Sequence, residues 1–576
     1  MMKIINNSIK LFLICAITYS TTFAQDYIRP PMINVPSGSF MMGSNIGKDD
    51  SKPMHHVSVA AFQMAKYPVT VAEFRIFVKE TNYKSTTVKC PDLIDQNWYS
   101  DPGKKSNGNW EKHLQSYSDF QPVTCITYQD VIAYINWLNK KSGLTYRLPT
   151  EEEWEYATKA NTTTSYFWGN DITKAYLYGN FADQSSEYFV SKEYGASYNG
   201  FIRTTNENDG EPFGAIVGLY HPNPFGLYDM VGNVDQMLST CYSVDTYKNK
   251  LSKVKETDKC KYITVRGGSW HYKPNPLWYR SRTKKASTFS STRRGFRLAV
   301  DGHGNNIDES SKTFEESLKK AKHIHLATRP TIPNIPKNIQ LVKLKDSIYK
   351  ISWDQNNSSE ITGYEIYQSN NSNAHILGGF YQKYYDKIKT ISATNNTSEV
   401  TVSKKGNSFK IVAKKMEFTS LPSKPVVVLN ELKTVNIPGN IALENSFSLT
   451  NLTLRHRKAT DKRSELYYLT ILGEAFKQNF ATAKFNVNVE KTGWYKLNYS
   501  GGPRSRKTGT FFMLTKGNKV IGEIKYDSKI NDRTSDRHKV YLEKGNYNLK
   551  INFLLNLKSM DMWNLFKLNF TEVTTK

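Results

Sequence analysis

The spacing of apolar residues changes along this 576-residue chain, and no single domain accommodates all of its patterns. From about residue 30 to 302, helix-like stretches such as 71–80 and 129–138 alternate with strand-like runs such as Met32–Val35. Beyond residue 333, apolar and polar residues alternate in short runs separated by turns rich in Asn and Ser. The patterns predict a multidomain chain: an α+β domain with much irregular structure, then two all-β sandwiches.

The domain boundaries follow changes in composition. We expect a first domain at 25–302, a linker at 303–332, a β-sandwich at 333–430 and a final β-sandwich at 431–576. Prolines near residue 333 punctuate the linker. A short charged helix is predicted at 315–322, so this tract is either a spacer or the edge of the first domain.

Aromatic residues in the two sandwiches have two interpretations. In the middle sandwich, which resembles a fibronectin type III domain, Trp353 and the nearby tyrosines are predicted to fill the core. The final sandwich has a weaker resemblance to carbohydrate-binding jelly rolls. There the aromatic candidates either stack on sugar rings or, as we favour, pack in the core; they are Trp494, Tyr495, Tyr547 and Trp563.

Residues 1–24 have the layout of a secretory signal. Two lysines precede an apolar run at 11–18, and small residues precede a cleavage point before Gln25. The alternative is lipid attachment at Cys15, which Ile14 disfavours by its size. No later apolar run reaches the roughly 18–20 residues that span a bilayer. We expect an exported protein, periplasmic or secreted, without a transmembrane segment.

Four cysteines remain after removal of the signal. Four thiols allow three pairings, and an oxidising compartment favours structural disulfides. Cys241–Cys260 is the preferred pair because it closes a short loop, which leaves Cys90–Cys125. A copper-binding or nucleophilic thiol is the competing interpretation, but none of the four has a nearby His or Cys at metal-ligand spacing.

The chain is strongly basic, with a formal net charge of +26. An exported protein meets little nucleic acid, so nucleic acid is not an expected partner. Sulfated or carboxylated polysaccharides are more plausible polyanions, because the same long-range electrostatics attract them. A basic surface without a specific partner is the alternative.

Six sequence words of the first domain resemble the formylglycine-generating enzyme (sulfatase-modifying factor) family, and they occur in that family's order. They are VPSGSFMMGS at 35–44, YPVTVAEF at 67–74, PVTCITYQDVIAYINWL at 122–138, RLPTEEEWEYA at 147–157, NPFGLYDMVGN at 223–233, and GGSW through GFR at 267–297. The resemblance covers about half of the chain and implies the C-type-lectin-related α+β fold of that family. The acidic residues after Thr150 are interpreted as charges suited to a helix start rather than as catalysts.

The closing signature, 265–300, departs from the family's oxidase members because it contains no cysteine. The resemblance implies a thiol pair at the positions of Tyr272 and Leu277, and soft thiolates are what hold Cu(I) for oxygen chemistry. We therefore predict no catalytic residues of that oxidase and no copper. In active members a groove here accepts an extended peptide, and the matching positions are Ser269, Trp270, His271, Tyr272, Tyr279, Arg280 and Arg282.

Two further metal hypotheses come from the resemblance. The family's two Ca²⁺ sites map to Asn180, the Phe181 carbonyl, Asp209 and Glu211, and to Asp229, the carbonyls of Gly232 and Val234, and Gln236. Gln236 replaces a carboxylate and Asp235 replaces a tryptophan, which weakens the second site; turn formation is the alternative role. A related branch binds iron through histidines of an added helical domain. No such domain is predicted here, and only His323 and His325 in the linker are candidates.

We weigh three functions. The sequence motifs of the family's scaffold are all present, but the thiol pair is missing. This favours an exported, non-catalytic protein that binds peptide or anionic glycan as an accessory in sulfated-polysaccharide processing. The association with sulfatases comes from the family alone. The second is a sulfatase-maturing enzyme that makes formylglycine through relocated thiols, which requires Cys241 and Cys260 to reach the groove unpaired. The third is a structural envelope-assembly protein.

Overall fold

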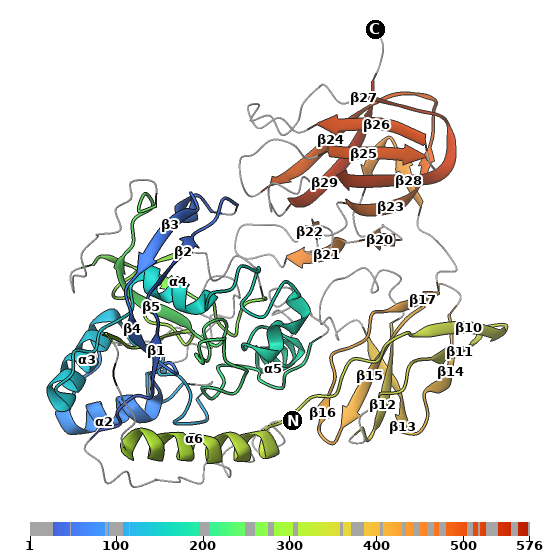
Figure 1. Ribbon diagram of the computed structural model, residues 1–576. Helices are drawn as coiled ribbons and strands as arrows, with labels where there is room; N and C mark the ends of the chain where they lie inside the picture. Colours follow the sequence, from blue (N-terminus) through green and yellow to red (C-terminus); the bar gives the residue numbers. More distant parts are fainter. Residues whose placement is uncertain are drawn as a thin grey trace. The chain divides into compact units, whose positions relative to one another are not determined.

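A computed structural model of the chain (Figure 1) divides into two compact units, Met1–Glu193 with Phe201–Thr331, and Tyr194–Gly200 with Ile332–Lys576. The predicted signal at 1–24 lies outside the described residues. No helix in the described part of the chain is both long and apolar enough to cross a membrane. The structure describes residues 27–46, 48–86, 90, 108–113, 116–194, 207–247, 260–274, 282–302, 304, 309–356, 361–369, 385–403, 407–428, 434–441, 448–450, 452–457, 466–471, 480–503, 511–516, 519–525, 539–554 and 563–573.

Three helices of the first unit begin at a threonine cap. Before α2 (Val71–Thr81), α3 (Tyr128–Ser142) and α4 (Glu151–Lys159), a threonine hydroxyl accepts the N–H of the third helical residue, whose carboxylate accepts the threonine N–H. This reciprocal capping box satisfies two donors that a helix start otherwise leaves unpaired. The predicted helices at 71–80 and 129–138 are confirmed. The other short helices of this region are η1 (Asp49–Ser51), η3 (Ile172–Leu177) and α5 (Gln184–Tyr194).

Small sheets hold the first unit together. An antiparallel sheet has the order β1-β4-β9 and a second has the order β7-β6-β5-β8, while β2 pairs with β3. In the second sheet β8 runs parallel to β5, which brings the end of the closing signature beside the segment after NPFGLYDMVGN. The strands are β1 (Met32–Val35), β2 (Gly38–Met42), β3 (His55–Val59), β4 (Phe62–Ala65), β5 (Asp235–Cys241), β6 (Tyr262–Arg266), β7 (Thr283–Ala286), β8 (Arg294–Phe296) and β9 (Ala299–Asp301).

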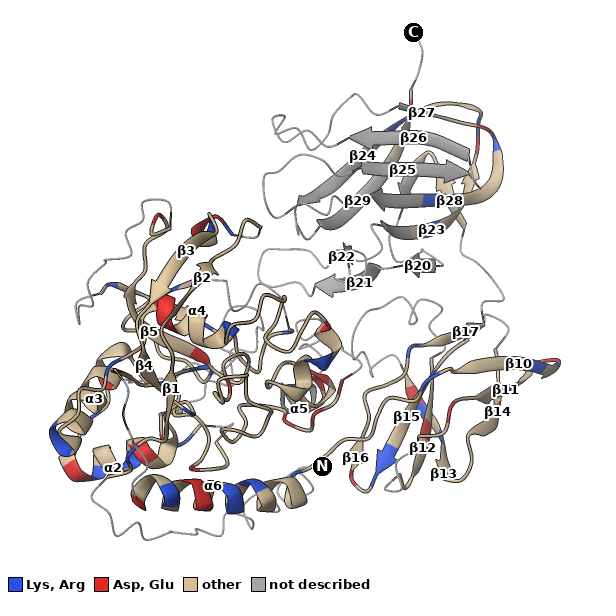
Figure 2. Cartoon of the chain, in the orientation of Figure 1, with Lys and Arg blue, Asp and Glu red and all other residues tan. Residues whose placement is uncertain are grey.

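Most of the predicted linker, 303–332, is a helix that packs on the first unit. α6 (Glu309–Thr328) buries Phe314 and Leu318 against Ile216 and Val217. α6 carries both acidic and basic residues along its length, as Figure 2 shows. The tract therefore forms the edge of the first unit over α6, and the predicted helix at 315–322 extends by more than a turn at both ends.

Ion pairs and hydrogen bonds fix the docking of α6 along its length. Glu315 pairs with Lys66 at 2.6 Å, and the Lys322 ammonium donates to the Gly218 carbonyl at 2.9 Å. Near the helix end, His325 Nε2 lies 2.7 Å from the Glu211 carboxylate, and Arg329 also donates to it. α6 thus reaches a residue of the first predicted calcium set.

The middle sandwich has the two sheets that its alternating sequence predicts. One has the order β10-β11-β14 and the other β13-β12-β15-β16, with β17 also on β15. Trp353 and Tyr364 are buried between them with ring centroids 5.2 Å apart, so their predicted role in the core is confirmed. The strands are β10 (Gln340–Lys345), β11 (Ile348–Ser352), β12 (Gly363–Ser369), β13 (Asp386–Ser392), β14 (Thr397–Thr401), β15 (Asn407–Lys415), β16 (Phe418–Thr419) and β17 (Val426–Val428).

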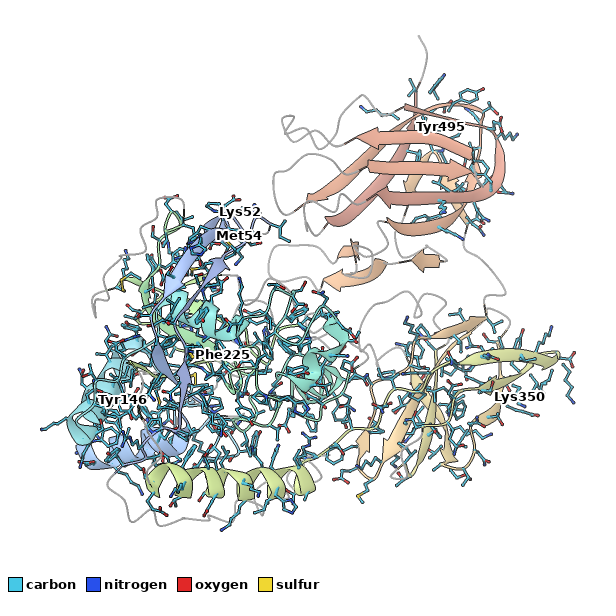
Figure 3. All side chains as sticks on the ribbon, viewed as in Figure 1. Lys52, Met54, Tyr146, Phe225, Lys350 and Tyr495 are labelled. Atoms are coloured by element: carbon cyan, nitrogen blue, oxygen red, sulfur yellow. A yellow bond between two sulfur atoms is a disulfide. The ribbon has the colours of Figure 1, made fainter. Side chains whose placement is uncertain are left out.

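The final sandwich contains two larger sheets. Their orders are β18-β23-β28-β25-β26, with β20 on β23, and β21-β22-β29-β24-β27, with β19 on β29. Tyr495, labelled in Figure 3, is fully buried, as are Phe485 and Phe570. The strands are β18 (Thr434–Ile437), β19 (Gly439–Ile441), β20 (Ser448–Thr450), β21 (Leu452–Arg457), β22 (Leu466–Ile471), β23 (Phe480–Val489), β24 (Gly493–Pro503), β25 (Phe511–Lys516), β26 (Lys519–Lys525), β27 (Lys539–Leu542), β28 (Gly545–Leu554) and β29 (Trp563–Glu572).

Candidate functional site

The first residues of the closing signature lie inside the first unit. Ser269 and Trp270 are fully buried, and the Trp270 backbone N–H donates to the Asn233 carbonyl at 2.9 Å. The indole packs edge-on against Phe213, with ring centroids 5.4 Å apart. Within the described residues, neither the Ser269 hydroxyl nor the indole N–H has a hydrogen-bond partner. Both groups keep a hydrogen-bonding capacity that a ligand in this region can use.

His271, a groove candidate of the signature, is held by a neighbouring arginine. Its Nδ1 lies 3.0 Å from Arg293 Nη1, and because a guanidinium only donates, Nδ1 is the acceptor and the ring proton is on Nε2. Burial, and then the positive charge of Arg293, lower the pKa of His271 well below its usual value. The imidazole is therefore neutral near pH 7, which disfavours a general-acid role.

Tyr272 occupies the first position at which the resemblance expects a thiol. Its carbonyl accepts the Ala182 N–H at 2.9 Å, and the Arg293 guanidinium lies 5.7 Å from its ring centroid. Burial raises the pKa of the phenol, so it is protonated at neutral pH. Leu277 at the second thiol position and the groove candidates Tyr279 and Arg280 lie outside the described residues.

Arg282, another groove candidate, belongs to a buried ion-pair cluster at the start of α4. Its Nε and Nη2 donate to the two carboxylate oxygens of Glu151 at 2.7 and 2.8 Å. Arg266 bridges Glu151 and Glu155 at 3.0 and 2.8 Å. Burial alone would raise the pKa of Glu151, but Arg266 and Arg282 outweigh it and lower that pKa to about 2. The cluster supports the structural interpretation of RLPTEEEWEYA.

Asp235 lies next to the closing signature. In the sequence it stands out only because it replaces a tryptophan of the family. Its N–H donates to the Arg293 carbonyl at 2.8 Å. Burial raises the pKa of Asp235 despite the nearby positive charges of Arg294 and Arg293. Burial also lowers the pKa of Arg294 to about 10. The sequence signal for the contact between Asp235 and the arginines was the acidic residue at a position where the family has tryptophan.

Both preferred disulfides are present, so the predicted pairing is confirmed. Cys90 is bonded to Cys125 with their Cα atoms 5.2 Å apart, and Cys241 is bonded to Cys260 with a Cα separation of 5.5 Å. These two bonds use every cysteine that follows the predicted signal. Cys260 precedes β6, so this disulfide joins β5 to the start of the strand that leads into the closing signature.

Part of the first predicted calcium set lies in a buried acidic region. The Asp209 N–H donates to Asp183 Oδ2 at 2.6 Å, and the Tyr220 hydroxyl donates to Asp209 Oδ2 at 2.8 Å. Burial raises the pKa of Asp183 to about 6. Burial, and then repulsion from Asp183, raise the pKa of Asp209 well above its usual value. Sequence reasoning missed Asp183, although it ends the same GNFAD word that supplied Asn180.

The remaining members of this set differ from one another. Asn180 is fully buried, and among the described residues its Oδ1 has no hydrogen-bond partner. Phe181 follows it and is also buried, while Glu211 is already paired with His325 of α6 and with Arg329, which follows α6. An unpaired amide oxygen in the same motif as a buried carboxylate fits a hard cation in donor type. Glu211 fits it poorly, because the Arg329 guanidinium already neutralises it.

The second predicted set is filled by protein hydrogen bonds. Gln236 Oε1 accepts from Trp154 Nε1 at 2.9 Å and from Arg297 Nε at 2.7 Å, and Gln236 Nε2 donates to the Asp229 carbonyl at 2.7 Å. The Asp229 carboxylate accepts from the Gly218 N–H at 2.7 Å. Both accepting positions of Gln236 Oε1 are therefore used, one by a guanidinium. The other members, Gly232 and Val234, are buried beside them.

Comparisons with known proteins agree with the geometry of the first unit. The profile of the sulfatase-modifying factor enzyme 1-like domain matches residues 20–302. A formylglycine-generating enzyme of Mycobacterium tuberculosis is 31% identical over 243 residues, which cover 36% of this chain and 73% of that protein. The chain belongs to this family. A mouse protein named inactive C-alpha-formylglycine-generating enzyme 2 is 28% identical over 246 residues, covering 38% and 70%.

Solved structures similar to the chain include PvdO from Pseudomonas aeruginosa, with 28% identity, 48% of this chain and 96% of that chain covered, and a TM-score of 0.37. An fn3 domain of human contactin 1 covers 18% of this chain and 79% of its own, with 10% identity and a TM-score of 0.15. A β-1,3-glucan-binding CBM6 from Bacillus halodurans covers 24% and 98%, with 14% identity and a TM-score of 0.19.

The donor atoms of this family member can be compared with the metals that the family implies. Cu(I) requires soft sulfur ligands, whereas the first thiol position holds a phenol and Cys260 is in a disulfide. The described residues at and around the closing signature, 260–274 and 282–302, offer no other sulfur. These residues do not fit copper. Within the described residues, no group of three or more His, Cys, Asp and Glu side chains has a metal-binding arrangement.

Proposed function

We propose that this formylglycine-generating enzyme family member is an exported binding or accessory protein in sulfated-polysaccharide processing and lacks the copper-dependent oxidase reaction. The observation that carries the proposal is the phenol of Tyr272 at the first thiol position, next to a neutral His271 that Arg293 holds. A phenol has no sulfur, so it can neither bind Cu(I) as a thiolate nor form a mixed disulfide with a substrate cysteine. The family includes members named as inactive, so the scaffold exists without the reaction.

The cysteine pairing supports the same proposal. An oxidase with relocated chemistry needs two free thiols near the signature, and Cys241 and Cys260 are its candidates. They are bonded to each other, as are Cys90 and Cys125. Counting free thiols on denatured, exported protein tests this directly: we expect none, and two reactive thiols would restore the oxidase hypothesis.

The decisive activity experiment uses a peptide with a sulfatase-type cysteine motif, Cu(I) and oxygen. We expect mass spectrometry to show unchanged peptide after incubation with this protein. The Mycobacterium tuberculosis relative, 31% identical, serves as the positive control under the same conditions. Conversion of the cysteine to an aldehyde by this protein would overturn the proposal.

We further propose that the protein binds a single Ca²⁺, at the first of the two sets that the resemblance implies. The ligands would be Asn180, the Phe181 carbonyl, Asp183 and Asp209, all oxygen donors of the kind that Ca²⁺ prefers. Asp183 takes the place that Glu211 held in the sequence prediction, because Glu211 is neutralised by Arg329. The second set would stay without a metal, because Arg297 donates to Gln236.

The proposed partners are anionic polysaccharides, and sulfatases through the association of the family. The net charge of +26 supports the polysaccharide part, because long-range attraction raises the local concentration of a polyanion. Charge alone gives binding that salt removes for every polymer. A specific role therefore requires a surface that recognises sugar rings as well as charge.

A further inference from the structure

We propose that the outer face of β24 and β27, in the final sandwich, binds an anionic polysaccharide, with Trp494 and Tyr541 as an aromatic platform for sugar rings. The choice of ligand class rests on the accessory function proposed above. The surface itself rests on the exposure, pairing and register of the residues on these two strands.

The pleat of the two strands separates core residues from surface residues. Tyr495, Val540 and Leu542 are 0–2% exposed and face the core. Because side chains alternate along a strand, their neighbours Trp494 and Tyr541 face outward, and each is 48% exposed. β27 ends the order of its sheet, so the face is bounded on one side by an edge strand.

The two aromatic residues form one contiguous platform. Trp494 and Tyr541 are direct partners in the antiparallel register, with ring centroids 5.5 Å apart and an angle of 66° between the ring planes. Aromatic side chains dominate the energetics of interfaces because each buries a large rigid area. The C–H face of a pyranose ring presents a flat apolar surface that can stack on one of these rings while the other contacts its side.

A basic residue lies next to the platform on β24. Lys496 is two residues from Trp494, so it lies on the same face of the sheet. Residues 431–576 contain 25 Lys and Arg against 13 Asp and Glu, so the sandwich favours a negatively charged ligand.

Charged residues also lie at the turns beside this face. Lys491, at the turn before β24, is 4.0 Å from Glu572, at the end of β29. Glu490 precedes Lys491, and Glu543 follows β27. The outer face of β24 and β27 combines the two aromatic rings with Lys496.

The size of the platform favours a sugar over a protein partner. Among the side chains that the structure describes in the final sandwich, Trp494 and Tyr541 are the only large hydrophobic ones that are exposed. A specific protein interface buries about 800 Å² on each partner and has an apolar centre. Two rings beside Lys496 are too small for that centre, whereas they suffice for one or two sugar rings.

The test measures binding of the full-length protein to dextran sulfate and to unsulfated dextran by calorimetry at physiological salt. These polymers share a backbone and differ in charge. We expect the wild-type protein to bind dextran sulfate and not dextran, and Trp494→Ala with Tyr541→Ala to weaken binding about tenfold, which corresponds to about 1.4 kcal/mol. Trp494→Phe, which keeps a ring, should retain most of the binding if the Ala variant folds poorly.

Matched controls separate this surface from general charge and exposure. Lys496→Gln should weaken binding more than Lys350→Gln, which removes the same charge from the middle sandwich (Figure 3). Leu344→Ala, also in the middle sandwich and 50% exposed, should have no effect. Thermal unfolding of each variant confirms that it is folded.

Each outcome has a distinct meaning. If the wild type binds dextran sulfate and the aromatic variants bind equally well, the platform is wrong while the proposed accessory function stands. Equal binding of dextran and dextran sulfate would overturn the anionic preference. If the wild type binds neither polymer, both the platform and the polysaccharide part of the proposed function fail.

Discussion

The closing signature of the first unit and the outer face of β24 and β27 use the same residue types in opposite ways. In the first unit, Trp270 and Arg282 are buried, and Arg282 forms an ion pair with Glu151. In the final sandwich, Trp494 is half-exposed, and Lys496 lies on the same face of β24. Aromatic and basic residues therefore indicate a binding surface only where the fold leaves them facing solvent.

The largest expected effect tests whether the buried charges of the first unit are structural. Glu151→Gln leaves Arg266 and Arg282 without their shared carboxylate, and breaking a buried ion pair costs about 3–5 kcal/mol of the free energy of unfolding. Chemical denaturation measures this loss. Glu309→Gln is the matched control, because that carboxylate is 80% exposed and should change stability by less than about 0.5 kcal/mol. A loss below 1 kcal/mol for Glu151→Gln would show that the cluster is not essential to the fold.

Removal of Ca²⁺ is expected to have the next largest effect. A ligand present at one hundred times its dissociation constant stabilises the folded state by about 2.7 kcal/mol, so chelation should lower the melting temperature. Asp183→Asn should abolish most of the difference between melting curves with Ca²⁺ and with chelator. Gln236→Ala should keep that difference, because its set is filled by protein hydrogen bonds. Identical melting curves for the wild type would contradict the calcium proposal.

A smaller effect concerns Glu73, which caps α2. Burial raises its pKa to about 7 in the folded protein from a usual value of 4.5. Between these two values the folded state holds a proton that the unfolded state has lost, so stability falls as pH rises through this range. Glu73→Gln keeps the capping geometry without titrating. We expect its stability relative to the wild type to improve by about 1–3 kcal/mol from pH 5 to pH 8; a pH-independent difference would contradict this.

The smallest effect sharpens the contrast between the two regions. Trp494→Ala should change the free energy of unfolding by about 0.5 kcal/mol or less, because the side chain is half-exposed. Its chain neighbour Tyr495 is fully buried, and Tyr495→Ala should cost about 3–5 kcal/mol. Equal losses for both variants in thermal unfolding would mean that Trp494 belongs to the core.

The sequence predicted the elements whose signals are local. Threonine caps and helical spacing located α2, α3 and α4, and the loop length favoured the Cys241–Cys260 bond that the structure contains. Other contacts depend on segments far apart in the chain. The pairing of Arg282 with Glu151 and of Glu211 with Arg329 joins such segments, and no spacing rule indicates them.

The final sandwich illustrates the same limit. Alternation identified β24 and β27, but it could not say which of Trp494 and Tyr495 faces outward, because that depends on how the two sheets pack. The sequence favours a packed core for both; the structure confirms this for Tyr495 but not for Trp494, which is half-exposed. Tyr541 escaped notice because its partner across the register is 47 residues away.

The position of α6 determines where the first unit can be separated from the rest of the chain. A fragment that stops after β9 would lose Phe314 and Leu318, and this loss would expose Ile216 and Val217 to solvent. Such a fragment should self-associate, whereas one that continues through Thr331 should remain dispersed. The boundary between the first unit and the two sandwiches therefore lies about thirty residues beyond β9, the last strand of the first unit.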